Sequence, residues 1–299
     1  TPYGSSAASD VYKRQHIGPS EKDQEKMLKD LNFKSLDEFI NSTIPEKIQF
    51  KGELNIGEPN SEYEALRKLK AISKKNQIYS NFIGMGYYGT YTPYVILRNI
   101  LENPGWYTSY TPYQPEVAQG RLEMLLNFQQ MIVDFTGMDI ANASLLDEGT
   151  AAAEAMGLSH RLNKSDSNLV FVSENCHPQT IDVIQTRAEP MGLKVLVGNE
   201  DKVLEQLKED IVCGVLQYPG TLGDIKDPSE AISKIHKKNG KAILVCDLLA
   251  LSMLKTPREL GADIAVGSSQ RFGIPMGYGG PHAAFFATKD EYKRSMPGR

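Results

Sequence analysis

Residues 169–188 read LVFVSENCHPQTIDVIQTRA. The first five form an apolar, β-branched run that predicts a buried strand, and Pro178–Ala188 predicts the amphipathic helix that follows. This alternation predicts an α/β fold, with a mostly parallel sheet covered by helices on both faces. From Ile140 onward it repeats, with strands expected at 194–197, 212–217, 242–246, 264–267 and 283–287, and helices at 149–160, 203–207 and 228–239.

Serine caps mark two helices ahead of this region, at Ser20 and Ser35, and a third helix is expected at 61–76. Glu38 is expected to complete a capping box with Ser35. These helices are assigned to a helical arm over residues 16–80, and the α/β domain is assigned to 81–299. Further helices are expected at 94–102 and 114–135, the second ending at Gly137. Residues 1–15 lack the apolar centre of a signal peptide and are expected to be a disordered or foreign extension.

The charge balance argues against several classes of partner. The 299 residues include 33 basic and 37 acidic ones, a net charge of −4, which gives no electrostatic footprint for nucleic acid or an anionic membrane. No apolar run approaches the roughly 20 residues that span a bilayer. The three cysteines are far apart in the sequence, which argues against a disulfide framework or metal site and fits a reducing compartment.

Tyrosine and glycine are concentrated in one segment, GMGYYGTYTPY at residues 84–94. Eight of the chain's 14 tyrosines lie between Tyr79 and Tyr113. Glycine permits tight turns and close approach, and a buried tyrosine hydroxyl needs a partner. The segment is therefore a candidate pocket wall, and packing at an interface is the alternative.

Ligands of parallel sheets bind beyond the carboxyl ends of the strands, and four loops fall there. Gly149, Thr150 and Ala151 open a helix whose free N–H groups form either an anion site or a simple cap. His177 follows one strand and is either an acid, base or stacking group or a structural residue. Asp247 follows another strand and either holds a cation or caps a turn. The fourth loop, GSSQRFG at 267–273, is rich in glycine.

The order of these loops resembles the pyridoxal-phosphate-dependent transferases of fold type I, the aspartate aminotransferase-like enzymes. In that family a helix-start glycine, a stacking aromatic residue, a strand-end Asp and a Ser-x-x-Lys loop follow one another. Gly149, His177, Asp247 and Gln270 occur here in that order. Gln270 or Arg271 stands where the Schiff-base lysine belongs, and neither forms an imine.

Longer strings resemble the glycine cleavage system P-protein family, the glycine decarboxylases, in the N-terminal part of its long single-chain form. The resemblance covers residues 15–299. The matching strings are HIGPS (16–20), GMGYYGT (84–90), NPGWYT (103–108), YTPYQPE (110–116), NASLLDEGTAAAEA (142–155), GSSQRFG (267–273) and PMGYGGPH (275–282).

The resemblance implies a fold type I large domain that belongs to a longer, homodimeric chain of two related halves. It implies that the C-terminal half carries the lysine for pyridoxal 5'-phosphate. The complete enzyme, a glycine dehydrogenase (aminomethyl-transferring, decarboxylating), then decarboxylates glycine and passes the aminomethyl group to the lipoyl arm of the H-protein. It would work in the cytoplasm of a bacterium or the mitochondrial matrix of a eukaryote, and this part alone would be inactive.

Two roles remain for this part of such an enzyme. In the first it shapes the shared site, with Tyr87, Tyr88, Thr90, Gln114 and Glu116 lining the glycine and lipoyl pocket. In the second it is a catalytically silent scaffold that docks the lysine-bearing half and the H-protein. Gly149, Thr150, Ala151, His177, Asp247 and Gln270 are expected to be vestigial cofactor-site positions, and the alternative is a site for a regulatory ligand.

Overall fold

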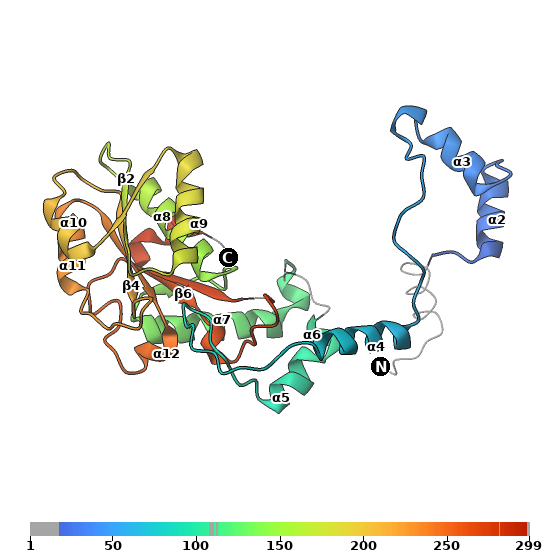
Figure 1. Cartoon of the computed structure of the whole chain (residues 1–299). Helices are drawn as coiled ribbons and strands as arrows, with labels where there is room; N and C mark the ends of the chain where they lie inside the picture. The colour runs from blue at the N-terminus through green and yellow to red at the C-terminus, as the bar shows by residue number, and fades with distance from the viewer. Residues whose placement is uncertain (1–17, 108–110, 112, 281, 298–299) are drawn as a thin grey trace. The chain divides into compact units, whose positions relative to one another are not determined.

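The computed structural model describes residues 18–297, except 108–110, 112 and 281 (Figure 1). The chain divides into two units, Thr1–Ile78 and Tyr79–Arg299. The extension expected at residues 1–15 lies outside the described residues. No described helix combines the length and the apolar composition needed to cross a bilayer.

The described part of the first unit contains three α-helices, α2 (Glu21–Asp30), α3 (Leu36–Thr43) and α4 (Glu62–Ser73). The caps predicted at Ser20 and Ser35 are confirmed, because each accepts a backbone N–H of the first turn. Ser61 caps the third helix in the same way. None of the three helices buries a side chain. The described part of this unit therefore has no apolar core of its own.

The capping box predicted at Ser35 consists of two hydrogen bonds, and the prediction is wrong for one of them. The Glu38 carboxylate accepts the backbone N–H of Lys34, 2.8 Å away, instead of the N–H of Ser35. The reciprocal bond has moved one residue toward the N-terminus, while the Ser35 hydroxyl still accepts the N–H of Glu38. The helix start is capped in both arrangements.

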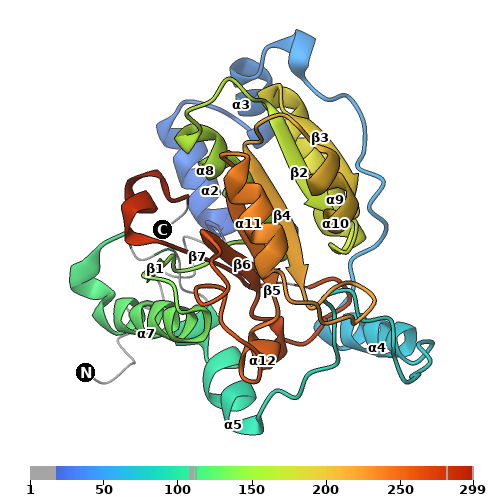
Figure 2. The same cartoon turned by 90° about the vertical axis from the view of Figure 1, so that its left-hand side faces the viewer.

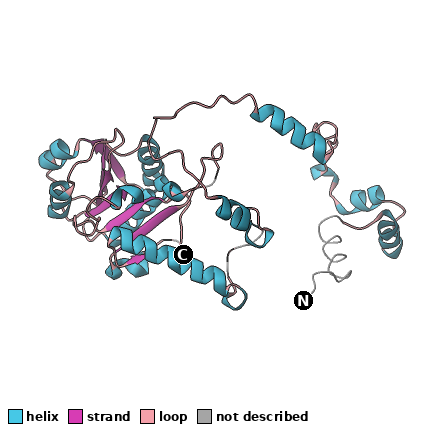
Figure 3. Ribbon diagram, turned by 90° about the horizontal axis from the view of Figure 1, so that it is seen from below, coloured by secondary structure: helices cyan, strands magenta, loops and turns pink. Residues whose placement is uncertain are grey.

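A seven-stranded sheet organises the second unit, in the order β1-β7-β6-β5-β4-β2-β3. Figure 3 draws the strands in magenta and the helices in cyan. The five strands from β3 to β6 are parallel, and β7 runs antiparallel to both β6 and β1, which confirms the predicted mostly parallel sheet. The strands are β1 (Ile140–Ala141), β2 (Leu169–Ser173), β3 (Lys194–Gly198), β4 (Cys213–Tyr218), β5 (Lys241–Cys246), β6 (Ile264–Ser268) and β7 (Ala284–Thr288).

Helices cover both faces of this sheet (Figure 2). One buried cluster joins α7, α10, α11 and α12 to one face, and a second joins α8 and α9 to the other. The helices of this unit are α5 (Tyr94–Ile96), α6 (Pro104–Tyr107), α7 (Gln119–Thr136), α8 (Glu148–Leu162), α9 (Pro178–Ala188), α10 (Glu200–Gln206), α11 (Ser229–Lys237) and α12 (Leu248–Leu251).

Two helix predictions ahead of the sheet need correction. The helix expected at 114–135 begins at Gln119, because Pro115–Val117 form a separate 3₁₀ turn. Its predicted end is confirmed, since Gly137 caps it in the left-handed conformation, with φ 67°. The helix expected at 94–102 is one α turn continued by a π turn over Leu97–Leu101.

Candidate functional site

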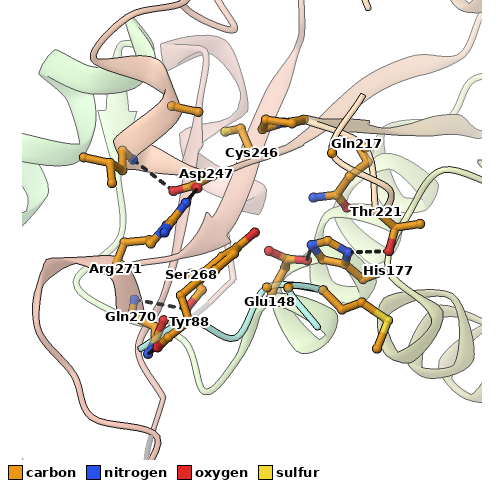
Figure 4. Close-up of a pocket in the computed structure, with 18 of the residues that line it drawn as sticks. Tyr88, Glu148, His177, Gln217, Thr221, Cys246, Asp247, Ser268, Gln270 and Arg271 are labelled. Atoms are coloured by element: carbon orange, nitrogen blue, oxygen red, sulfur yellow. Dashed lines mark hydrogen bonds and ion pairs between the residues drawn. The ribbon is translucent and has the colours of Figure 1, made fainter. Parts of the chain in front are cut away.

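A cavity of about 590 Å³ opens at the carboxyl ends of β4, β5 and β6. Each strand contributes a residue from its end to the lining, namely Gln217, Cys246 and Ser268. The segment around Tyr88, the start of α8, His177 and the loop after β6 complete the wall. Figure 4 shows Asp247 and Arg271 on one side of the cavity and Glu148 with His177 on the other.

Asp247 follows β5 directly, and its side chain serves two purposes. One carboxylate oxygen accepts the backbone N–H of Leu249 at 3.0 Å and so caps α12, a short helix absent from the sequence prediction. The other accepts both Nε and Nη2 of Arg271, at 3.0 and 2.9 Å. Asp247 therefore caps a turn, which was one of its two predicted roles, and the cation beside it is Arg271 of the same chain.

His177 immediately precedes α9 and is only 5% exposed. Its Nδ1 lies 3.0 Å from the hydroxyl of Thr221. Its Nε2 lies 4.0 Å from Glu148 Oε1, which is beyond hydrogen-bonding distance. Burial lowers the pKa of His177, although the negative charge of Asp247 acts in the opposite direction, so the imidazole is neutral at neutral pH.

Glu148 is the first residue of α8 and carries the most strongly perturbed carboxyl group in the cavity wall. Burial raises its pKa to about 7, and the charges of Asp247 and Asp147 add to the rise. A hydrogen bond from the Thr180 hydroxyl, 3.2 Å away, partly offsets these effects. Near neutral pH the cavity therefore contains a carboxyl group that readily gains and loses a proton.

The start of α8 matches the cap that was the alternative to an anion site. Asp147 accepts the backbone N–H of Thr150 at 2.7 Å, and its second oxygen accepts the Thr150 hydroxyl at 3.1 Å. Ala151 is fully buried, and a Cβ on Gly149 would lie 3.1 Å from Val183 on α9. These residues cap and pack the helix, and two carboxylates stand where an anion would approach.

The residues present do not fit a covalently held pyridoxal phosphate. None of the described residues that line the cavity is a lysine. Arg271 forms an ion pair with Asp247, so this carboxylate is not free to pair with a pyridinium nitrogen. Gln270 donates its amide hydrogens to the carbonyl oxygens of Tyr88 and Ile274. Nor do the described residues group three or more His, Cys, Asp or Glu side chains around a metal position.

The structure separates the five residues proposed to line the glycine and lipoyl pocket. Tyr88 lines the cavity, whereas Tyr87 lines a neighbouring one of about 200 Å³ and packs edge-on against His282. The Thr90 hydroxyl donates to the carbonyl oxygen of Ile274. Gln114 and Glu116 are exposed ahead of α7 and line neither cavity.

Sequence reasoning passed over two residues of this site. The sequence assigns no role to Glu148, although an acid beside Gly149 argues against an anion site. It offers Arg271 only as a possible occupant of the lysine position. An arginine 24 residues beyond a strand-end Asp was a possible signal for their ion pair, but only the fold places the two side chains together.

Known proteins resemble the chain over nearly its whole length. The family model described as "Glycine cleavage system P-protein" matches residues 14–299. "Glycine dehydrogenase (decarboxylating)" of Pelagibacter ubique is 81% identical over 96% of this chain, and the protein of that name from Stutzerimonas stutzeri is 55% identical over 97%. The chain spans 30% of the length of each of these two relatives.

Solved structures agree with the sequence comparisons. A crystal structure of glycine decarboxylase (P-protein) of the glycine cleavage system, in inhibitor-bound form, superposes with a TM-score of 0.85 and 34% identity. The match covers 94% of this chain and 64% of that one. A sphingosine-1-phosphate lyase from Burkholderia pseudomallei, 13% identical with a TM-score of 0.57, shares the fold alone. The fold is that of pyridoxal-phosphate-dependent enzymes of type I, and the chain belongs to the glycine cleavage system P-protein family.

Proposed function

We propose that this chain forms the N-terminal portion of a glycine decarboxylase and shapes the active site that the complete enzyme uses. The observation that carries the proposal is the family match over residues 14–299, with 81% identity to a glycine dehydrogenase (decarboxylating). The complete enzyme would release CO2 from glycine and pass the aminomethyl group to the lipoyl arm of the H-protein. This chain alone would not catalyse that reaction.

In this proposal the cofactor binds to the part of the complete enzyme that this chain does not cover. Pyridoxal 5'-phosphate would supply an electron sink for the decarboxylation there. The chain's own contribution is the glycine-rich segment that carries Tyr88, in the wall of the larger cavity, and Tyr87, in the wall of the smaller one. Burial raises the pKa of Tyr88, so its phenol stays protonated at neutral pH and is able to donate a hydrogen bond to a bound anion.

Thr90, Gln114 and Glu116 have a less direct part in this proposal. The Thr90 hydroxyl is engaged by Ile274 and so fixes the segment instead of contacting substrate. Gln114 and Glu116 are exposed on the chain ahead of α7, where a partner surface could meet them. They would serve the lipoyl arm only in the assembled enzyme.

A catalytically silent scaffold is the second candidate function. The observation that favours it is the loop after β6, where Gln270 and Arg271 stand at the lysine position and bind groups of the same chain. In that case His177 and Asp247 are vestigial, and the chain serves to dock the lysine-bearing half and the H-protein.

A full-length chimera tests the two functions against each other. In it, this chain replaces the matching part of the Pelagibacter ubique relative. Tyr88→Phe and Glu116→Ala are introduced separately, and exchange of CO2 with labelled glycine is measured with lipoylated H-protein. A loss of tenfold or more with Tyr88→Phe supports a shaped site. Rates unchanged in both variants support the scaffold, and Tyr63→Phe, on α4 in the first unit, is the matched control.

The proposed partners are glycine, the lipoylated H-protein, the lysine-bearing half and a second copy of the full-length chain. Nucleic acid and membranes are not among them. Both curated relatives named above are bacterial proteins, so a bacterial cytoplasm is the proposed compartment, and the mitochondrial matrix would apply to a eukaryotic source.

A further inference from the structure

We infer that Gln270 and Arg271 are positioning residues that clamp Tyr88 and its glycine-rich segment at the cavity. The inference rests on the proposed function, because the clamp affects turnover only if Tyr88 lies in the working site. Gln270 is 1% exposed, and its amide nitrogen donates to the Tyr88 carbonyl oxygen at 2.8 Å. The same nitrogen donates to the Ile274 carbonyl oxygen at 2.9 Å. One buried side chain thus joins two segments that are far apart in the sequence.

Arg271 holds the ring of the same tyrosine. Its guanidinium carbon lies 3.6 Å from the centroid of the Tyr88 ring, while two of its nitrogens donate to Asp247. A planar guanidinium donates hydrogen bonds with its edge, here from two nitrogens to one oxygen of Asp247, and stacks on an aromatic ring with its face. Asp247 therefore fixes the arginine, and the arginine fixes the ring (Figure 4).

Further contacts hold the glycine-rich segment ahead of Tyr88. Gln179 of α9 donates its amide hydrogen to the Met85 carbonyl oxygen at 2.7 Å. Met85 has a φ of 55°, a left-handed conformation that non-glycine residues adopt at an energetic cost. Gly86 lies so close to His177 that a Cβ would be 3.2 Å from the imidazole ring. The segment is thus held against α9 in a strained conformation.

The segment beyond Tyr88 is tied to the loop after β6. The hydroxyl of Thr90 donates to the Ile274 carbonyl oxygen at 2.9 Å, and that of Thr92 donates to the Gly273 carbonyl oxygen at 2.6 Å. Residues 270–274, which occupy the place of the cofactor loop, therefore contact residues 88–92 through backbone and side chain alike. This loop therefore holds residues 88–92 in place through these hydrogen bonds.

A merely structural role predicts a different behaviour for Arg271. If the arginine only neutralises Asp247, its loss affects the end of β5 and is independent of the identity of residue 88. If it positions Tyr88, the two residues must be energetically coupled, and loss of the tyrosine ring must abolish the effect of changing the arginine.

The test uses the full-length chimera with Arg271→Met, Arg271→Lys, Tyr88→Leu and the double variant Tyr88→Leu/Arg271→Met. We expect Arg271→Met to lower kcat/KM for glycine–CO2 exchange about tenfold, and the same change to have less than twofold effect once Tyr88 is leucine. Arg271→Lys keeps the charge but loses the flat, two-pronged geometry, so it restores less than half of the lost rate. Arg187→Met, in a surface ion pair with Glu154, is the matched control.

Hydrogen exchange of backbone amides tests the positioning of Tyr88 independently of the proposed function. The Tyr87 amide, which donates to the Gly84 carbonyl oxygen at 3.1 Å, should exchange at least tenfold faster in Arg271→Met and in Gln270→Met, with α9 and β5 unchanged. Faster exchange with unchanged turnover in both Arg271→Met and Tyr88→Leu would support the clamp and overturn the proposed function. Unchanged exchange in both clamp variants would overturn the clamp.

A second variant covers the case in which Arg271→Met fails to fold, because that change leaves Asp247 without its counter-ion. Asp247→Asn combined with Arg271→Met removes both charges together. The same faster exchange of the Tyr87 amide is expected, and normal exchange there in the folded double variant would overturn the inference.

Discussion

At the residue scale, Glu148 gives the cavity a pH-dependent contribution to stability. Its folded-state pKa of about 7 lies above the ordinary carboxyl value of 4.5 because the group is buried. The folded chain therefore binds this proton more tightly than the unfolded chain does. The stability that Glu148 contributes is complete below pH 4.5 and is lost as the pH rises through 7.

Replacing this carboxyl group should remove that loss. Glu148→Gln keeps an oxygen to accept the Thr180 hydroxyl and cannot ionise. It is expected to raise the free energy of unfolding by up to about 3 kcal/mol at pH 8 and to have little effect at pH 4. Urea unfolding of the 299-residue chain across this range measures the difference. Equal stabilities at every pH would contradict the prediction, and Glu123→Gln, at an exposed position of α7, is the control.

A substitution at Gly267 tests how closely β6 packs against β5. A Cβ at this position would lie 2.1 Å from the Cys246 carbonyl oxygen and 2.8 Å from the Phe285 ring. Gly267→Ala must displace backbone and is expected to lower the free energy of unfolding by about 3 kcal/mol or more. Gly157→Ala inside α8 meets only Arg161 at 3.6 Å and should raise stability by about 0.5–1 kcal/mol. Thermal unfolding of both variants measures the contrast, and similar shifts in both would be the contrary result.

At the element scale, Asp147 determines how α8 begins. Asp147→Ala removes the acceptor for the Thr150 N–H and should lower the free energy of unfolding by about 1 kcal/mol. Asp147→Asn keeps an acceptor oxygen and should stay within a few tenths of a kcal/mol of the parent chain. Chemical denaturation of the pair measures both effects. Two variants of equal stability would show that the side chain does not act as a cap.

Local patterns were enough to predict most elements of the fold. Strand runs such as Leu169–Ser173 and the terminating Gly137 were found because their signals lie within a few residues of each other. The antiparallel insertion of β7 between β6 and β1 was not predicted, because strand direction depends on the path of the intervening glycine-rich loop. The late start of α7 has a local cause, the proline at 115, which permits a 3₁₀ turn and delays the helix.

The site was predictable only in part. The loops carrying His177, Asp247 and Gln270 were identified because the end of a parallel strand is a general binding position, and all three line one cavity. The contacts within it were not, because the partners of Arg271 come from 24 and 183 positions away along the chain, at Asp247 and Tyr88. A sequence shows which side chains are available, but long-range packing decides which of them meet.

At the scale of the whole molecule, the division into two units predicts a site of cleavage. Residues 76–83 follow α4 without a helix or strand and are exposed. Brief trypsin treatment of the native chain is expected to cut after Lys74 or Lys75 and leave the second unit whole, because a protease needs exposed, unstructured backbone. Mass spectrometry of the products identifies the cut. A chain with both lysines changed to glutamine should resist it, and early cuts within the sheet would contradict the division.

The ion pair between Asp247 and Arg271 also bears on how the protein matures in the cell. Enzymes whose native state is stabilised by a captured small molecule depend for their folded yield on the supply of that molecule. Here the cation that neutralises the strand-end carboxylate is synthesised with the chain, always in a one-to-one ratio. The folding of this unit is therefore expected not to require pyridoxal phosphate, and production of the 299-residue chain in a host starved of cofactor precursors should give the same amount of folded material.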